Sequence, residues 1–323
     1  MRESLAPAPG KACYVWCALK SVLPLRAVLV TGKGGVGKTT VAASLARHLA
    51  ARGKRVLVAE IASDGAAASP LADALGIEAL AEEPVEIAPN LKAASLAPVI
   101  GHQKFLRDVL PMKLLADAAM KSAAIRRFLA AAPTFPEMGV LYRLLDLVRA
   151  KRRDGSVEHE SIVVDLPATG HALALAQIPQ SLLRVIPTGP IANAVREGLE
   201  LLMDPKQTGA VVVTLPETLP VTEAIELATG IEQHQIPLAQ VVLNRVPFDP
   251  FSPEEKVAVR RLLEGRPPTL GERTVERIDR ARVAFARLEA SVRAPVDVLH
   301  DVWLEGPRLA EEMASLMAVE APR

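Results

Sequence analysis

Residues 31–40 read Thr-Gly-Lys-Gly-Gly-Val-Gly-Lys-Thr-Thr, and these residue types at this spacing can bind a polyphosphate. They match the phosphate-loop pattern GxxxxGK[ST], with an apolar strand candidate before them at 25–30 and a helical segment after them at 40–52. Closely spaced glycines let consecutive backbone N–H groups converge on one point, because no Cβ prevents positive φ. The N-terminus of the following helix adds partial positive charge. The segment therefore predicts a nucleotide-binding loop.

The side chains of this loop suggest separate roles in binding phosphate and metal. We expect Lys38 to contact the β- and γ-phosphates of ATP and the Thr39 hydroxyl to ligate Mg²⁺. The nucleotide-binding residues predicted from the run are Gly32, Lys33, Gly34, Gly35, Val36, Gly37, Lys38, Thr39 and Thr40.

A second apolar run, residues 161–165, ends in a carboxylate, as a strand that helps to bind Mg²⁺ would. We expect Asp165 to hold the ion, usually through a water ligand. Residues 166–171, Leu-Pro-Ala-Thr-Gly-His, follow directly, and such a segment suits a switch that responds to the γ-phosphate. Within it, His171 is either a structural residue or a sensor of that phosphate.

Composition narrows the class of protein. The 323 residues include 38 Lys and Arg against 37 Asp and Glu, so no basic field favours nucleic acid, and ten aromatic residues provide few stacking surfaces. Cys13 and Cys17 are the only cysteines, which excludes a disulfide scaffold and makes a reducing, cytoplasmic setting the default. The apolar stretch 12–30 is interrupted by charged residues and proline, which argues against a spanning helix.

The pattern of apolar runs predicts an α/β fold with a doubly wound, mostly parallel sheet, because most runs are continuously apolar and helical segments separate them. The predicted strands are 27–30, 55–59, 91–96, 161–165, 182–186, 209–215 and 240–244, with C-terminal helices at 274–290 and about 307–317. We expect one domain over 25–318 with a helical insertion at about 100–160. An N-terminal extension at 1–24 and a tail at 319–323 would flank it.

The loop and the Asp165 segment together resemble the ArsA-type ATPases, a family that includes arsenite-pump ATPases and ATPases that target tail-anchored membrane proteins. Residues 33–39 match the family's deviant Walker A motif, and residues 165–171 resemble its second switch, D-x-x-P-T-G-H. Two weaker matches are Val-Thr-Leu-Pro-Glu at 213–217, followed by Thr-Glu-Ala at 222–224, and Val-Val-Leu-Asn-Arg at 241–245.

The resemblance implies an ATP- and Mg²⁺-dependent homodimer. Lys33 would be the signature lysine that reaches the nucleotide of the second subunit, where a cation delivered on dimer closure stabilises transition-state charge. Asn244 would read adenine. The partner would be an unidentified protein client or a membrane partner.

The chain also departs from the family pattern. Ala62 stands where the first switch carries the Asp that orients the attacking water, and either Asp64 or Glu60 is expected to replace it. The cysteines that hold zinc at the dimer interface of targeting ATPases, and those that bind metalloids in arsenite pumps, are missing, so no zinc is expected and arsenite binding is disfavoured.

Two other functions fit parts of the sequence. A ParA/MinD-type positioning ATPase shares the deviant Walker A motif, but it predicts a basic DNA-binding surface or a C-terminal membrane helix, and neither is evident. A non-hydrolysing nucleotide-binding scaffold would be explained by Ala62. We expect an ATPase whose hydrolysis depends on Lys33, Lys38 and Asp64.

Overall fold

The computed structural model describes residues 19–61, 69–109, 135–167, 177, 179–181, 183–184, 187–265 and 270–318. Its centre is an eight-stranded sheet in the order β3-β4-β2-β5-β1-β6-β7-β8. The strands are β1 (Ala27–Gly32), β2 (Val56–Ile61), β3 (Val85–Ala88), β4 (Leu91–Leu96), β5 (Ser161–Asp165), β6 (Thr208–Thr214), β7 (Leu238–Val246) and β8 (Val296–His300). All neighbouring strands pair in parallel except β3, which runs antiparallel to β4 at the edge. The predicted mostly parallel sheet is confirmed.

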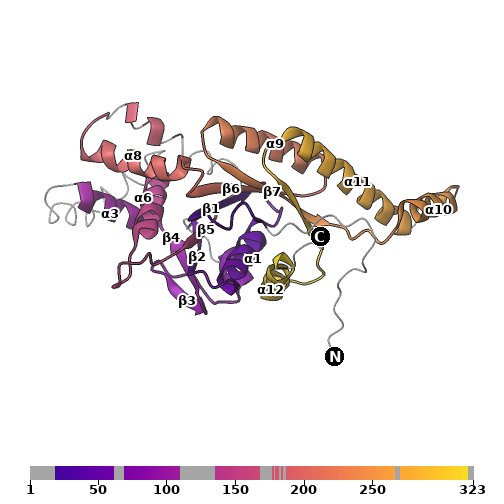
Figure 1. Cartoon of the computed structure of the whole chain (residues 1–323), viewed down its shortest axis with the longest axis horizontal. Helices are drawn as coiled ribbons and strands as arrows, with labels where there is room; N and C mark the ends of the chain where they lie inside the picture. Colours follow the sequence, from indigo (N-terminus) through magenta and orange to yellow (C-terminus); the bar gives the residue numbers. More distant parts are fainter. Residues whose placement is uncertain are drawn as a thin grey trace.

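The helices cover both faces of this sheet (Figure 1). They are α1 (Lys38–Ala51), α2 (Pro70–Leu75), α3 (Pro98–Val109), α6 (Phe135–Arg149), α8 (Pro190–Met203), α9 (Thr218–Gln233), α10 (Pro253–Leu263), α11 (Leu270–Ser291) and α12 (Gly306–Met317). One buried apolar cluster joins the sheet to α1, α2 and α12, and a second joins it to α6, α9 and α11. Because both faces are covered, β1, β5 and β6 are buried along their whole length, which explains their continuously apolar sequences.

The segment that precedes β1 also contributes to the core. Leu19, Val22 and Leu25 are buried in the cluster that contains α1. The Leu19 backbone N–H donates to the Asp297 carboxylate of β8 at 3.2 Å.

The described part of the segment predicted as a helical insertion is mainly helical. Helices α3 and α6 pack so closely that a Cβ on Gly101 would lie 1.7 Å from the Gly139 carbonyl oxygen. Residues 150–160 make a turn closed by an antiparallel bridge between Lys151 and Val157. Residues 110–134 lie outside the described part of the chain.

Three strand assignments from the sequence needed correction. Residues 183 and 184, inside a predicted strand, are helical. The strand prediction failed because an apolar run of this length suits a helix and a strand equally. Leu183 packs against a small apolar cluster that includes residues of α8. Strands β3 and β8 were not predicted. β3 is a short, partly exposed edge strand, and Asp297 interrupts the apolar sequence of β8. None of the described helices combines the length and the apolar character needed to span a bilayer.

Candidate functional site

The glycine loop begins where β1 ends and α1 starts, and its backbone adopts the conformations that required glycine. Gly32, Gly35 and Gly37 have φ of 148°, 80° and 90°. A Cβ on Gly32 would lie 2.3 Å from the Val213 carbonyl oxygen of β6, so no larger residue fits there. No side chain of the described residues caps the N-terminus of α1, and its first turn holds no acidic residue, which suits its N–H groups to an anionic ligand.

Lys38 lies across this loop. Its Nζ donates to the backbone carbonyl of Lys33 at 3.0 Å, which holds the ammonium group against the loop's own backbone. Burial lowers the pKa of Lys38, and the nearby Asp165 carboxylate opposes that shift. The position agrees with the expected contact to phosphate oxygens, which would replace the carbonyl as acceptor.

Thr39 and Asp165, the two predicted Mg²⁺ ligands, are in direct contact. The Thr39 hydroxyl donates to Asp165 Oδ2 at 2.6 Å. The other carboxylate oxygen, Oδ1, is buried and has no hydrogen-bond partner among the described residues. Burial raises the pKa of Asp165 to about 6, against the lowering effects of the Thr39 hydrogen bond and the Lys38 charge. A buried carboxylate with an unsatisfied oxygen beside a hydroxyl fits a divalent cation, which would bind that oxygen and offset its desolvation.

Asn244, predicted to read adenine, lies against the phosphate loop. It is buried near the end of β7, and its Nδ2 donates to the Val36 carbonyl at 2.9 Å. A Cβ on Gly37 would lie 2.5 Å from that Nδ2, so the glycine is needed for this contact. The hydrogen bond fixes the Asn244 side chain beside the loop, and adenine recognition by its Oδ1 stays a prediction.

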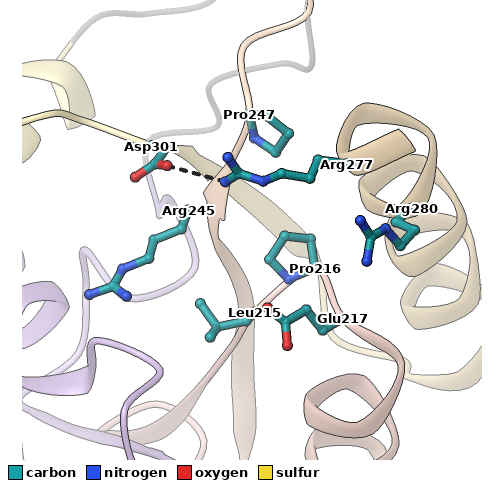
Figure 2. A pocket seen from close by; sticks show the side chains of 8 residues that line it. All are labelled: Leu215, Pro216, Glu217, Arg245, Pro247, Arg277, Arg280 and Asp301. Atoms are coloured by element: carbon teal, nitrogen blue, oxygen red, sulfur yellow. Dashed lines mark hydrogen bonds and ion pairs between the residues drawn. The ribbon is translucent and has the colours of Figure 1, made fainter. Parts of the chain in front are cut away.

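A cavity of about 380 Å³ is lined by Arg245, the residue after Asn244 in β7 (Figure 2). Its walls come from the ends of β6 and β7, the residue after β8, and α11; they are Leu215, Pro216, Glu217, Arg245, Pro247, Arg277, Arg280 and Asp301. Arg277 forms an ion pair with Asp301 at 3.4 Å, whereas the Arg245 side chain extends away from both α11 arginines. Arg245 has a φ of 55°, a conformation that residues other than glycine seldom adopt and that occurs preferentially near functional sites.

Lys33, the predicted intersubunit lysine, pairs within its own chain. Its Nζ lies 2.7 Å from Glu223 Oε1 of α9, and 51% of the Lys33 side chain is exposed. No role was predicted for Glu223 from the sequence. The sequence does mark this position, because residue 223 belongs to the Thr-Glu-Ala stretch that resembles the ArsA-type pattern. The stretch by itself does not indicate that Glu223 pairs with Lys33.

Of the two carboxylates predicted to orient the attacking water, the structure describes Glu60 alone. Glu60 accepts the backbone N–H of Leu71 at 2.9 Å and so anchors the start of α2. Asp64 lies outside the described residues, as do Ala62 and His171. The other predicted loop residues, from Gly32 to Thr40, are gathered around the N-terminus of α1.

Comparison with known proteins agrees with this geometry. The sequence profile of a family described as anion-transporting ATPases matches residues 25–197. The chain is 28% identical over 226 residues to the ATPase BagA of Mycobacterium tuberculosis, covering 68% of this chain and 65% of that protein. It is 30% identical over 199 residues to an arsenical pump-driving ATPase of Escherichia coli, covering 57% of this chain and 33% of the relative. The chain thus spans just under two thirds of the mycobacterial protein's length.

Proposed function

This chain belongs to the ArsA-type family of anion-transporting ATPases, and from that premise we propose that it binds ATP with Mg²⁺ in the glycine loop and hydrolyses it. The observation that carries the proposal is the contact between Thr39 and Asp165 at the start of α1, which places a hydroxyl beside a buried carboxylate whose second oxygen has no partner in the described part of the chain. This pair is the arrangement that a metal bound to a nucleotide requires.

Each group of the loop has a defined task in this proposal. The N–H groups at the start of α1 bind phosphate oxygens, and the Lys38 ammonium exchanges the Lys33 carbonyl for them. Thr39 and Asp165 hold Mg²⁺, which when bound neutralises charge on the β- and γ-phosphates. The cavity beside Asn244 takes the base and ribose, since its prolines and Leu215 offer apolar surface and its acids offer acceptors to hydroxyl groups.

The test is ATP affinity by calorimetry with the Lys38→Ala variant. We expect at least about tenfold weaker binding, because the variant loses a charge-assisted contact in a partly buried site. Lys206→Ala, a change of an exposed lysine, is the control and should bind as the wild type does. Unchanged affinity in Lys38→Ala would rule out the assignment.

We further propose that ATP drives formation of a homodimer in which Lys33 reaches the nucleotide of the second copy. The half-exposed position of Lys33 supports this role, because 51% of its side chain is open to solvent. Light scattering with and without a non-hydrolysable ATP analogue tests it. A molecular mass that stays the same in both conditions, monomeric or dimeric, contradicts a nucleotide-dependent dimer. The ATP-bound dimer would act on a protein client or membrane partner, to be identified by what co-purifies with an ATP-locked form.

A non-hydrolysing nucleotide-binding scaffold is the second candidate. The observation that favours it is the hydrogen bond between Glu60 and the start of α2, which gives one of the two candidate carboxylates a structural task. Phosphate release at the level of the buffer blank, with ATP binding intact, would select this candidate over the ATPase.

A further inference from the structure

The ion pair between Lys33 and Glu223 connects two elements that meet because of the strand order. Lys33 follows β1, Glu223 lies in the second turn of α9 that follows β6, and β1 and β6 are neighbours in the sheet. The pair therefore lies at the carboxyl edge of the sheet, beside the phosphate loop. Nζ and Oε1 are 2.7 Å apart, with 51% and 23% of the two side chains exposed.

Both lysines of the loop are thus held within one protomer. Lys38 Nζ binds the Lys33 backbone carbonyl, while the Lys33 side chain is directed to α9. The Glu223 carboxylate occupies one of the three N–H donors of the Lys33 ammonium group and holds the side chain against α9. A phosphate on another molecule must therefore compete with Glu223 for the position of this group.

We propose that Glu223 is a positioning residue for Lys33, which it restrains until a nucleotide carried by a second copy of the chain competes for the ammonium group. The inference rests on the proposed function, in which Lys33 acts across the dimer. A half-exposed ion pair is weak, so the restraint opens readily and shifts dimerisation by a few-fold rather than blocking it. The polyphosphate of a second copy carries more negative charge than the one carboxylate of Glu223, so it displaces Glu223 from the Lys33 ammonium group when the two molecules meet.

The first test uses Glu223→Gln, which keeps the size of the side chain and removes its charge. With a non-hydrolysable ATP analogue, sedimentation should show the dimer forming at about two- to fivefold lower protein concentration than in the wild type. ATP affinity and the melting temperature of the monomer should stay unchanged. Glu226→Gln is the matched control, because Glu226 is an exposed carboxylate of the same helix and forms no ion pair among the described residues.

The second test needs no nucleotide. Acetylation of Lys33 by a small amine-reactive reagent, followed by mass spectrometry, should be about two- to fivefold faster in Glu223→Gln, since the Glu223 carboxylate no longer holds the Lys33 nitrogen and shields it from the reagent. Acetylation of Lys206 should be the same in both proteins. Combining Lys33→Ala with Glu223→Gln should give the dimerisation of Lys33→Ala alone, because the two residues act through one contact.

Three results would overturn the proposal. The first is an unchanged rate of Lys33 acetylation in Glu223→Gln. The second is that Glu223→Gln dimerises with ATP at the same protein concentration as the wild type. The third is weaker ATP binding or lower stability of Glu223→Gln, which would make Glu223 a purely structural support of the loop. Failure of the proposed function looks different, because the wild type and both glutamate variants would then all fail to dimerise or to bind ATP.

Discussion

Glu60 and Asp165 are opposite each other in the parallel pairing of β2 and β5, at the ends of the two strands. Two carboxylates therefore meet at one edge of the sheet, and the Glu60 charge adds to the burial that raises the pKa of Asp165. Their hydrogen bonds separate their tasks. Glu60 accepts the Leu71 backbone N–H at the start of α2. Asp165 accepts the Thr39 hydroxyl, and its other oxygen has no partner within the described ranges.

This division gives a prediction for the residue that orients the attacking water. Asp64→Asn should lower steady-state phosphate release on the order of 10²–10⁴-fold with ATP affinity preserved, as expected when a positioned base is lost. Glu60→Gln keeps an acceptor for Leu71 and should change release far less. The opposite pattern would assign the role to Glu60, and equal, negligible rates in all three proteins would support the scaffold function.

Gly32 and Gly34 should differ in how much their replacement by alanine lowers the stability of the fold. Gly32→Ala should lower the free energy of unfolding by about 1–3 kcal/mol, because its Cβ meets the Val213 carbonyl and its φ of 148° is unfavourable for alanine. Gly34→Ala should change it by less than about 0.5 kcal/mol, since no described residue other than its two chain neighbours comes within 4 Å of the added Cβ. Urea unfolding of the nucleotide-free proteins measures both, and equal losses would contradict the described geometry of β1 and β6.

Asp165→Asn should weaken Mg²⁺ binding and raise the stability of the nucleotide-free protein. The amide keeps an acceptor for Thr39 and removes a buried charge whose pKa is raised to about 6, so the nucleotide-free protein should gain about 1–2 kcal/mol at pH 8. Melting with ATP and Mg²⁺, compared with ATP and a chelator, should then show the Mg²⁺-dependent rise in the wild type alone. A rise of equal size in the variant would remove Asp165 from the metal site.

His159 should make stability depend on pH. Burial lowers its pKa from 6.5 to about 4, and the charged groups that act on it are Glu158, Lys92, Arg143 and Arg55. Between pH 6.5 and 4, His159 binds a proton in the unfolded chain but stays neutral in the folded protein. The free energy of unfolding therefore decreases as the pH falls, by no more than about 3 kcal/mol. Denaturation of the wild type and His159→Gln across this range measures the effect. Parallel curves for the two proteins would show that His159 does not contribute.

Much of the fold follows from patterns that are local in sequence. The apolar runs that became β1, β4, β5, β6 and most of β2 and β7 were identified because strands buried on both faces need apolar residues throughout. The edge strand β3 and the strand β8 were missed because partial exposure and one buried acid weaken that pattern. The order of the strands could not be predicted, since each apolar run would fit any interior position of the sheet.

The sequence by itself determined the chemistry of the loop, because glycine, lysine and threonine at fixed spacing within ten residues create a phosphate site through local backbone geometry. Only the tertiary structure decided which distant groups complete that site. Placing β1 between β5 and β6 brings Asp165 to Thr39 across 126 residues and Glu223 to Lys33 across 190, and β7 brings Asn244 to Val36 across 208. The physical reason is that a side-chain contact depends on distance in space, and the order of strands sets that distance independently of separation along the chain.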